Sequence, residues 1–268
     1  MMPNNLDSKL SKYYTNYYKG QLGLPDWESR VESRLNEEDI YCRRYIELIQ
    51  EYFDYDFANK KVLVVGCGTG GELVNFHKKG ADVYGIEPSM DAIEICLLKA
   101  ELHNIKKENV VLGISESLPF EEKSFDFIYC FTVLEHVSDV KASIVEMVRC
   151  VKPQGKIFIE TPDYRQLYEG HYKLPLPMIL PNWFNKIILI ILGRPHYYID
   201  SINKISSKYL QNIFSTLPVT PIRVYRTNQM EIPNFNFKIL YVVQLIQYCI
   251  SHYFGIDINQ LWLLVREK

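Results

Sequence analysis

The feature that most constrains this chain is an apolar run at 62–65 that passes directly into a glycine-rich turn at 66–71. Four apolar residues in a row suit a central parallel strand that is covered on both faces. Glycines in the turn allow positive φ angles and let a ligand approach the backbone closely. The helix expected from about residue 71 presents free N–H groups and the positive end of its dipole to that ligand. The sequence therefore predicts a strand, a ligand-binding turn and a helix in succession.

A second strand-like run at 82–86 leads to Glu87, sixteen residues after Gly71. An acid at this place can accept hydrogen bonds from the two hydroxyls of a ribose. The two features together predict a nucleoside-type cofactor. The choice of cofactor stays open at this point, because Gly66, Gly68 and Gly71 also satisfy the dinucleotide pattern G-x-G-x-x-G.

Strand and helix patterns alternate between residues 60 and 162, which argues for parallel βαβ units. Helices are expected between the strands, one of them capped by Ser89. Crossovers of this kind are right-handed, and the ligand crevice lies at the carboxyl ends of the strands. The fold class is therefore α/β, with a Rossmann-like, doubly wound, mostly parallel seven-stranded sheet and an antiparallel C-terminal strand. The strands are expected near 61–66, 82–87, 109–113, 125–131, 155–161, 219–226 and 260–266.

The chain divides into three parts on this pattern. Residues 1–55 are expected to form an N-terminal helical cap, 56–163 the cofactor-binding core, and 164–268 lid inserts for the acceptor together with the last two strands. The cap carries tyrosines at 13, 14, 17 and 18, which share one side of a helix. They can form the core of the cap, or one of them can reach the cofactor or substrate.

Charge and cysteine usage exclude several classes of function. The formal net charge is −2 and no cluster of Lys and Arg stands out, so nucleic acid is not an expected partner. Six cysteines are scattered without C-x-x-C pairs or metal-ligand spacing, which favours free thiols in a reducing compartment and no metal site. The first residues lack an apolar signal core, so a cytoplasmic location is expected.

Four stretches, in order, resemble the motifs of class I S-adenosylmethionine-dependent methyltransferases. V-L-V-V-G-C-G-T-G at 62–70 resembles the first motif, and G-I-E-P-S at 85–89 the second. L-P-F at 118–120, S-F-D at 124–126 and L-E-H-V at 134–137 resemble the third and fourth strand regions, and V-K-P-Q-G-K at 151–156 the turn before strand five. The later motifs have no reason to occur in an NAD-dependent dehydrogenase, and a short-chain dehydrogenase would also want a Tyr-x-x-x-Lys pair that this chain lacks. That enzyme class stays a remote alternative.

The resemblance implies that S-adenosyl-L-methionine is the cofactor and that the chain is an enzyme. The glycine turn is expected to hold the methionine portion and Glu87 the ribose, with Phe131 and Thr132 alongside. Many relatives carry an aspartate for the adenine amino group, but Ile114 stands at that position here. The adenine contacts are then expected from Ser115 and Glu116, although Glu116 can equally be a solvated loop acid. The expected cofactor-binding residues are Gly66, Cys67, Gly68, Thr69, Gly70, Glu87, Pro88, Ser115, Glu116, Phe131 and Thr132.

The same resemblance implies in-line methyl transfer, for which the protein mainly supplies proximity and alignment. An oxygen acceptor would also gain from a base. His136 is the first candidate, because an unperturbed imidazole titrates close to neutral pH. Its alternative is a purely structural role. Asp163, directly after the fifth strand, is the second candidate.

The acceptor is expected to bind to the inserts at 164–205 and 229–258. E-G-H-Y-K-L-P at 169–175 resembles a run in bacterial methyltransferases of surface-polysaccharide or glycolipid synthesis. This favours O-methylation of a small molecule, a sugar or a lipid-linked sugar. A quinone precursor or a phenol is an alternative acceptor, and a non-catalytic cofactor-binding partner subunit is an alternative function. Candidate pocket residues are His171, Tyr172, Arg194 and His196.

Two apolar stretches, 176–192 and 237–254, are too short or too polar for a membrane-spanning helix. They are expected to form lid helices packed over the site, or to touch the inner face of a membrane peripherally. Monomer and homodimer are both open.

Overall fold

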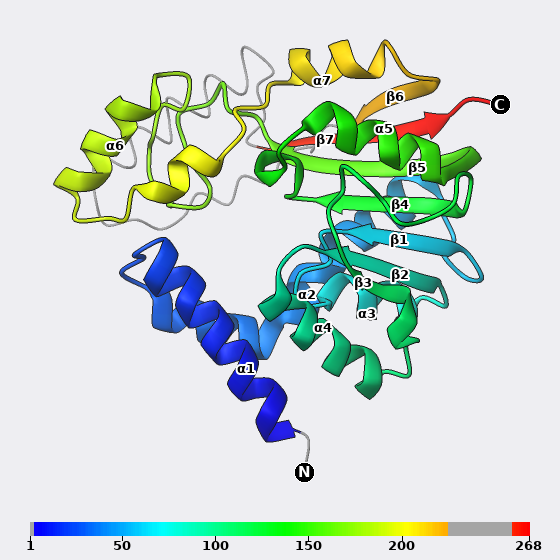
Figure 1. Ribbon diagram of the computed structural model, residues 1–268, viewed down its shortest axis with the longest axis horizontal. Helices are drawn as coiled ribbons and strands as arrows, with labels where there is room; N and C mark the ends of the chain where they lie inside the picture. The colour runs from blue at the N-terminus through cyan, green and yellow to red at the C-terminus, as the bar shows by residue number, and fades with distance from the viewer. Residues whose placement is uncertain (1–2, 225–258) are drawn as a thin grey trace.

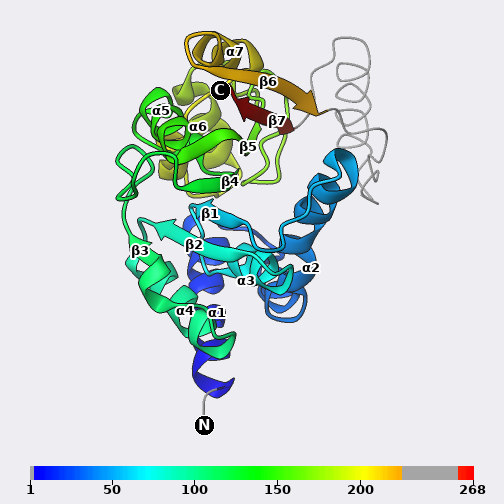
Figure 2. The same ribbon diagram turned by 90° about the vertical axis from the view of Figure 1, so that its right-hand side faces the viewer.

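The computed structural model describes residues 3–224 and 259–268. Its sheet has seven strands in the order β3-β2-β1-β4-β5-β7-β6 (Figures 1 and 2). β7 runs antiparallel to β5 and β6, whereas the pairings among β1 to β5 are parallel. The predicted fold class is confirmed, including the antiparallel C-terminal strand. The strands are β1 Lys61–Val65, β2 Asp82–Glu87, β3 Val110–Leu112, β4 Phe125–Phe131, β5 Val151–Pro162, β6 Val219–Val224 and β7 Asn259–Arg266.

Helices cover both faces of the sheet, as Figure 2 shows. One face packs against α2 (Trp27–Phe53), α3 (Gly71–Lys78) and α4 (Met90–Leu102). The other packs against α5 (Val140–Cys150) and α7 (Ser207–Phe214). The predicted cap on α4 is present, since the Ser89 side chain accepts a hydrogen bond from the Ala92 N–H at 3.3 Å.

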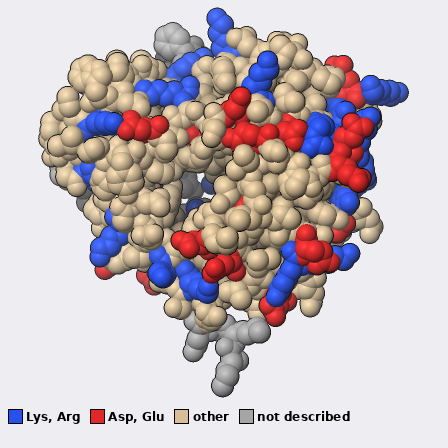
Figure 3. Space-filling view, in the orientation of Figure 1, with Lys and Arg blue, Asp and Glu red and all other residues tan. Residues whose placement is uncertain are grey.

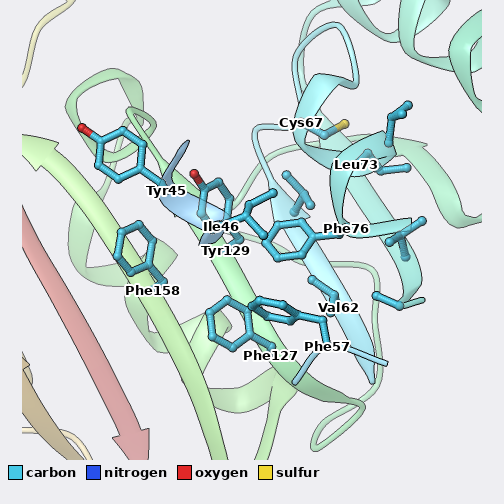
Figure 4. Packing of buried hydrophobic residues seen from close by; sticks show 14 of the residues in the cluster. Tyr45, Ile46, Phe57, Val62, Cys67, Leu73, Phe76, Phe127, Tyr129 and Phe158 are labelled. Carbon is cyan, nitrogen blue, oxygen red and sulfur yellow. The ribbon is translucent and has the colours of Figure 1, made fainter. Parts of the chain in front are cut away.

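The unbroken apolar run of β1 follows from this double cover. Val62 and Val64 belong to the core under α2 and α3, and Leu63 and Val65 to the core under α5. All four are buried, so neither face tolerates a polar residue. Figure 4 shows the first core, in which aromatic rings meet edge to face; the ring centroids of Phe57 and Phe127 are 5.1 Å apart at 89°.

A third core joins the N-terminal helices to the insert that follows β5. Helix α1 (Pro3–Thr15), the π-helix Asn16–Gln21 and the residues just after it contribute buried side chains such as Leu10 and Leu22, and the insert contributes Leu176 and Met178. Figure 1 places α1 and the insert beyond the carboxyl ends of the parallel strands. The N-terminal helices and the insert therefore together cover the carboxyl edge of the sheet, where the ligand crevice was predicted. The predicted boundaries after residues 55 and 163 stay predictions.

Helix α6 (Asn182–Ile191) lies in this insert and carries the predicted apolar stretch at its surface. Trp183 is 63% exposed and Ile191 is 78% exposed, so this face of α6 is not buried by the described residues. No helix within 3–224 or 259–268 is long and apolar enough to cross a membrane. The stretch predicted at 237–254 lies outside the described residues.

Candidate functional site

The glycine turn meets its neighbours closely at two positions and faces open space at a third. Gly66, Gly68 and Gly70 have φ angles of 65°, 51° and 88°. A Cβ on Gly66 would lie 2.4 Å from Val133 Cγ2, and one on Gly70 2.8 Å from Cys96 Sγ. A Cβ on Gly68 would meet nothing within 4 Å. The backbone at Gly68 is thus bare and accessible, as a ligand cradle requires.

Glu87 ends β2 beside this bare backbone. One carboxylate oxygen accepts the Gly68 N–H at 2.9 Å and the other accepts the Ser89 N–H at 2.9 Å. Burial raises the pKa of Glu87, and these two hydrogen bonds offset only part of that effect. The carboxylate is fixed in place, and it retains lone pairs that can accept ribose hydroxyls.

A cavity of about 160 Å³ opens at the same edge. It brings together Gly66, Pro88 and His136, which the sequence predicts as site residues on three different loops. The cavity is smaller than the roughly 300 Å³ at which ligand clefts usually begin, so it suits one part of a nucleoside cofactor. Its lining consists of Val65, Gly66, Ile86, Pro88, Gly113, Ile114, Ser115, Glu116, Val133, His136, Val137 and Ser138.

The predicted adenine residues line this cavity but are engaged within the protein. Ser115 is buried, and its hydroxyl lies 2.8 Å from that of Ser143. Glu116 is half-buried and accepts the Ser138 N–H at 2.7 Å. It is therefore no freely solvated acid, because it fixes the loop ahead of α5. Ile114 is 51% exposed on the cavity wall.

Side chains of the N-terminal cap form hydrogen bonds with the glycine turn, a contact that the sequence did not predict. Glu38 of α2 accepts hydrogen bonds from the Thr69 hydroxyl at 2.6 Å and the Tyr14 hydroxyl at 2.9 Å, and it pairs with Lys99 of α4. Tyr14 is buried, so of the two predictions for the tyrosine stripe the core role holds for this residue. Its hydroxyl nevertheless lies 3.1 Å from Thr69 Oγ1.

The other predicted cofactor residues lie around the turn. Cys67 is buried, with its sulfur 3.9 Å from that of Cys96. Phe131 packs its ring 4.6 Å from that of Tyr45. Thr132 follows with a φ of 51°, a strained conformation that turns the chain sharply away from the sheet.

After this turn, the 3₁₀ segment Leu134–His136 lies at the cavity, and His136 lines its wall. Residues of the insert contact His136 there. The His136 and His171 ring centroids are 5.1 Å apart. Behind His171, the fully buried Glu169 places one oxygen 2.6 Å from His171 Nδ1 and accepts the Tyr172 N–H with the other at 2.7 Å. Tyr198 places its hydroxyl 3.4 Å from His136 Nε2.

The pKa values of the two histidines shift in opposite directions. His136 is exposed to solvent, but the atoms packed around its ring partly desolvate it, and this desolvation, together with the neighbouring His171, lowers its pKa to about 4, so its imidazole is neutral at neutral pH. Burial also lowers the pKa of His171, but the hydrogen bond and charge of Glu169 outweigh it and the net shift is upward. Burial raises the pKa of Glu135 to about 7. The sequence predicted His136 and His171 but missed both glutamates, although each adjoins a histidine in E-H or E-G-H.

Asp163 does not lie free at the site. It is fully buried, and Arg165 donates to both of its oxygens, at 2.9 Å and 2.5 Å. A carboxylate held in this way is poorly suited to take a proton, so the geometry does not favour the predicted base role. Of the other pocket candidates, Arg194 reaches the Leu22 carbonyl at 3.5 Å and His196 is exposed.

Figure 3 shows a hollow in the surface between the insert and the part of the molecule that holds the sheet. Acidic and basic side chains are interspersed on this face, with no wide basic area. A family profile described as "Methyltransferase domain" matches residues 36–214, which include the glycine turn, Glu87 and both histidines. The chain belongs to the methyltransferase domain family. The predicted resemblance is confirmed, and S-adenosylmethionine is the cofactor of this methyltransferase.

Curated relatives carry the name ubiquinone biosynthesis O-methyltransferase. The Rickettsia bellii protein is 31% identical over 136 residues, which cover 51% of this chain and 55% of the relative. The Neisseria meningitidis serogroup A protein is 33% identical over 108 residues, covering 40% and 45%. The chain thus spans about half the length of the curated relatives it matches.

Solved structures support the fold of this methyltransferase at low sequence identity. YcgJ from Bacillus subtilis superposes with a TM-score of 0.56 at 19% identity, covering 84% of this chain and 99% of that one. PH0226 from Pyrococcus horikoshii gives a TM-score of 0.55 at 15% identity, covering 96% and 99%. The bare backbone at Gly68 and the fixed carboxylate of Glu87 fit a nucleoside cofactor. Which residues contact it stays a prediction.

Proposed function

We propose that this methyltransferase acts on a hydroxyl oxygen. The observation that carries the proposal is the Glu169–His171 pair, which faces His136 at the wall of the cofactor cavity. A hydroxyl loses its proton when it is methylated, and a positioned base speeds that step. The name O-methyltransferase of the curated relatives supports the same chemistry.

For the cofactor, we assign the backbone of 66–70 to the methionine portion and Glu87 to the ribose hydroxyls. The adenine is assigned to the 160 Å³ cavity, where Ile86 and Ile114 offer apolar walls and Ser115 the polar edge. With an isoleucine at the position where many relatives have an aspartate, the base is held mainly by packing. When bound, S-adenosylmethionine supplies an electrophilic methyl group.

For the proton, we assign the histidine pair. His136 is neutral at neutral pH and lines the cavity, whereas His171 is the stronger base because Glu169 raises its pKa. Asp163 is assigned a positioning role, since Arg165 joins it to the Ser207 hydroxyl at 2.8 Å and so ties the end of β5 to α7.

For the acceptor, we propose an aromatic hydroxyl on a quinone precursor with an apolar tail. The relatives' names favour it, and the exposed apolar face of α6 offers a surface for such a tail. A hydroxyl of a lipid-linked sugar is the second candidate, favoured by the run at 169–175. Peripheral contact of α6 with a membrane belongs to the same proposal.

The test is a methyl-label screen of the full chain with S-adenosylmethionine against polyprenylated phenols, lipid-linked saccharides and sugar nucleotides. We expect label on the oxygen of a polyprenylated phenol, and at least a tenfold loss of kcat in His171→Ala. His77→Ala, in the last turn of α3, is the matched control. Label on nitrogen or carbon overturns the proposal. Cofactor binding by calorimetry without transfer to any hydroxyl would favour the partner-subunit alternative.

A further inference from the structure

A buried carboxylate with one unpartnered oxygen lies beside the histidine pair. Glu135 is fully buried; Thr161 donates to its Oε2 at 3.0 Å, whereas Oε1 has no hydrogen-bond partner among the described residues. An orphaned buried acceptor costs free energy unless a ligand satisfies it. Ligating atoms of Glu135, His136 and His171 all lie within 4.8 Å of one another. A carboxylate with one unsatisfied oxygen and two imidazoles therefore lie within reach of a single ion.

The histidine from the insert is also oriented as metal-bound histidines are. Glu169 holds His171 through Nδ1 at 2.6 Å, which leaves Nε2 as the free ring nitrogen. A carboxylate behind a ligating imidazole fixes the ring and raises its basicity. Glu169 is itself fixed, because it accepts the Tyr172 N–H at 2.7 Å. The Glu169 carboxylate and the His171 ring are therefore both held in place.

We propose that Glu135, His136 and His171 bind a divalent first-row transition metal ion, of which zinc is the probe. Metal–ligand bonds of about 2.0–2.2 Å place two ligands of a tetrahedral ion roughly 3.3–3.6 Å from each other. The spacing of up to 4.8 Å between the ligating atoms closes with side-chain movements of about 1 Å, for which side-chain rotation suffices. Imidazole suits zinc, iron or nickel, whereas magnesium and calcium prefer all-oxygen sites.

Three protein ligands leave at least one position of the ion open, as in catalytic sites. The site adjoins the cofactor cavity through His136. The role we infer for the ion rests on the proposed function: it holds the acceptor's hydroxyl and stabilises the oxygen anion. The hydroxyl proton leaves to solvent, the oxygen lone pair forms the bond to the methyl carbon, and the electrons of the carbon–sulfur bond go to sulfur. In this state His136 and His171 are ligands, and the ion replaces them as the source of activation.

The sequence carried no sign of such a site. His136 and His171 are 35 residues apart, on a loop after β4 and on the insert after β5. The expectation of no metal rested on short-range ligand spacing, and only the fold brings these two segments together.

The test uses the full chain, treated with a chelator and then titrated with Zn²⁺ or Mg²⁺ by calorimetry, with the visible absorption of Co²⁺ as a second readout. We expect one Zn²⁺ per chain and much weaker Mg²⁺ binding. Glu135→Gln and His171→Gln should each weaken Zn²⁺ binding by at least about tenfold, and Glu169→Gln by roughly 10–100-fold. His77→Ala should bind Zn²⁺ as the parent does. Far-UV circular dichroism and thermal unfolding show which variants are folded.

Two results overturn the site: a folded parent chain that binds no Zn²⁺ or Co²⁺, or a folded His171→Gln chain that binds as tightly as the parent. If chelator-treated protein methylates its acceptor at the full rate, the metal's role fails and the proposed function stands. If the ion binds but no hydroxyl is methylated, the proposed function fails and the metal site stands.

Discussion

Thr69 of the glycine turn donates its hydroxyl hydrogen to Glu38 of α2 across 2.6 Å. The same carboxylate receives Tyr14 from α1 and Lys99 from α4, and the Lys99 and Glu38 side chains are only 8% and 13% exposed. Three helices are thus tied to one residue of the glycine turn. This relationship makes the N-terminal cap part of the structure that supports the turn and not merely a cover over it.

Glu38→Gln should weaken both the fold and the cofactor site. It keeps the shape of the side chain but leaves the charge of Lys99 largely buried and unpaired, at a cost of about 3 kcal/mol in the free energy of unfolding. S-adenosylmethionine binding should also weaken, because Thr69 loses its charged partner. Denaturant unfolding and calorimetry measure the two effects. The control is Glu94→Gln, which removes the exposed pair of Lys9 and Glu94 and should change neither.

Gly66→Ala and Gly68→Ala should separate folding from binding. Both substitutions place an alanine in the left-handed backbone conformation, which lowers the free energy of unfolding by roughly 1 kcal/mol each. At Gly66 the new methyl also meets Val133 at 2.4 Å, so thermal stability without cofactor should fall further. At Gly68 the methyl enters open space, so the fold should survive while S-adenosylmethionine affinity drops. Equal cofactor affinity of parent and Gly68→Ala would remove the cradle assignment.

The local signals of this chain were sufficient for the fold. Each of three local patterns depends only on residues that are close in sequence, and each is present as predicted. They are the apolar strand at 62–65, the helix cap at Ser89 and the positive φ angles of the glycines at 66, 68 and 70. The candidate site residues could be placed on their elements only where the signal is equally local, as in the turn itself and Glu87; their contacts with the cofactor stay predictions.

Side-chain contacts, most of them long-range, account for what the sequence missed. Glu38 meets Thr69 across 31 positions, and no pattern in α2 distinguishes it from a solvated acid. Asp163 was placed correctly at the end of β5, but Arg165, two residues later, occupies both of its oxygens. The pairing of His136 with His171 depends on how the insert folds back over β4, which periodicity does not encode.

The exposed face of α6 makes a prediction about lipid. Ile190 and Ile191 are 58% and 78% exposed, so replacing both with glutamate should leave the fold intact. If α6 rests on a membrane, the parent chain should float with phosphatidylglycerol vesicles and the double variant should not. Tyr52→Glu changes an apolar residue of α2 that is 60% exposed and should float like the parent. A parent chain that remains unbound to every vesicle would exclude the membrane contact.

Glu87 makes a prediction about pH. Burial sets its folded-state pKa above the value of 4.5 for an ordinary glutamate. Protonation removes the charge that receives the ribose hydroxyls, so S-adenosylmethionine affinity should fall as pH decreases through this raised pKa.

The effect of Glu87 on stability has the opposite direction. Because its folded-state pKa is raised, its contribution to stability is fully present below pH 4.5 and is lost as pH rises through the folded value. Glu87→Gln, which cannot titrate, should therefore lower affinity at neutral pH and flatten the acid limb of the affinity profile. It should also remove this residue's share of the pH dependence of unfolding. Calorimetric titrations of S-adenosylmethionine between pH 4 and 8, for the parent and Glu87→Gln, measure the first effect, and denaturant unfolding over the same range measures the second. If both proteins show the same acid limb, another group controls cofactor binding, and Glu87 loses its assignment to the ribose.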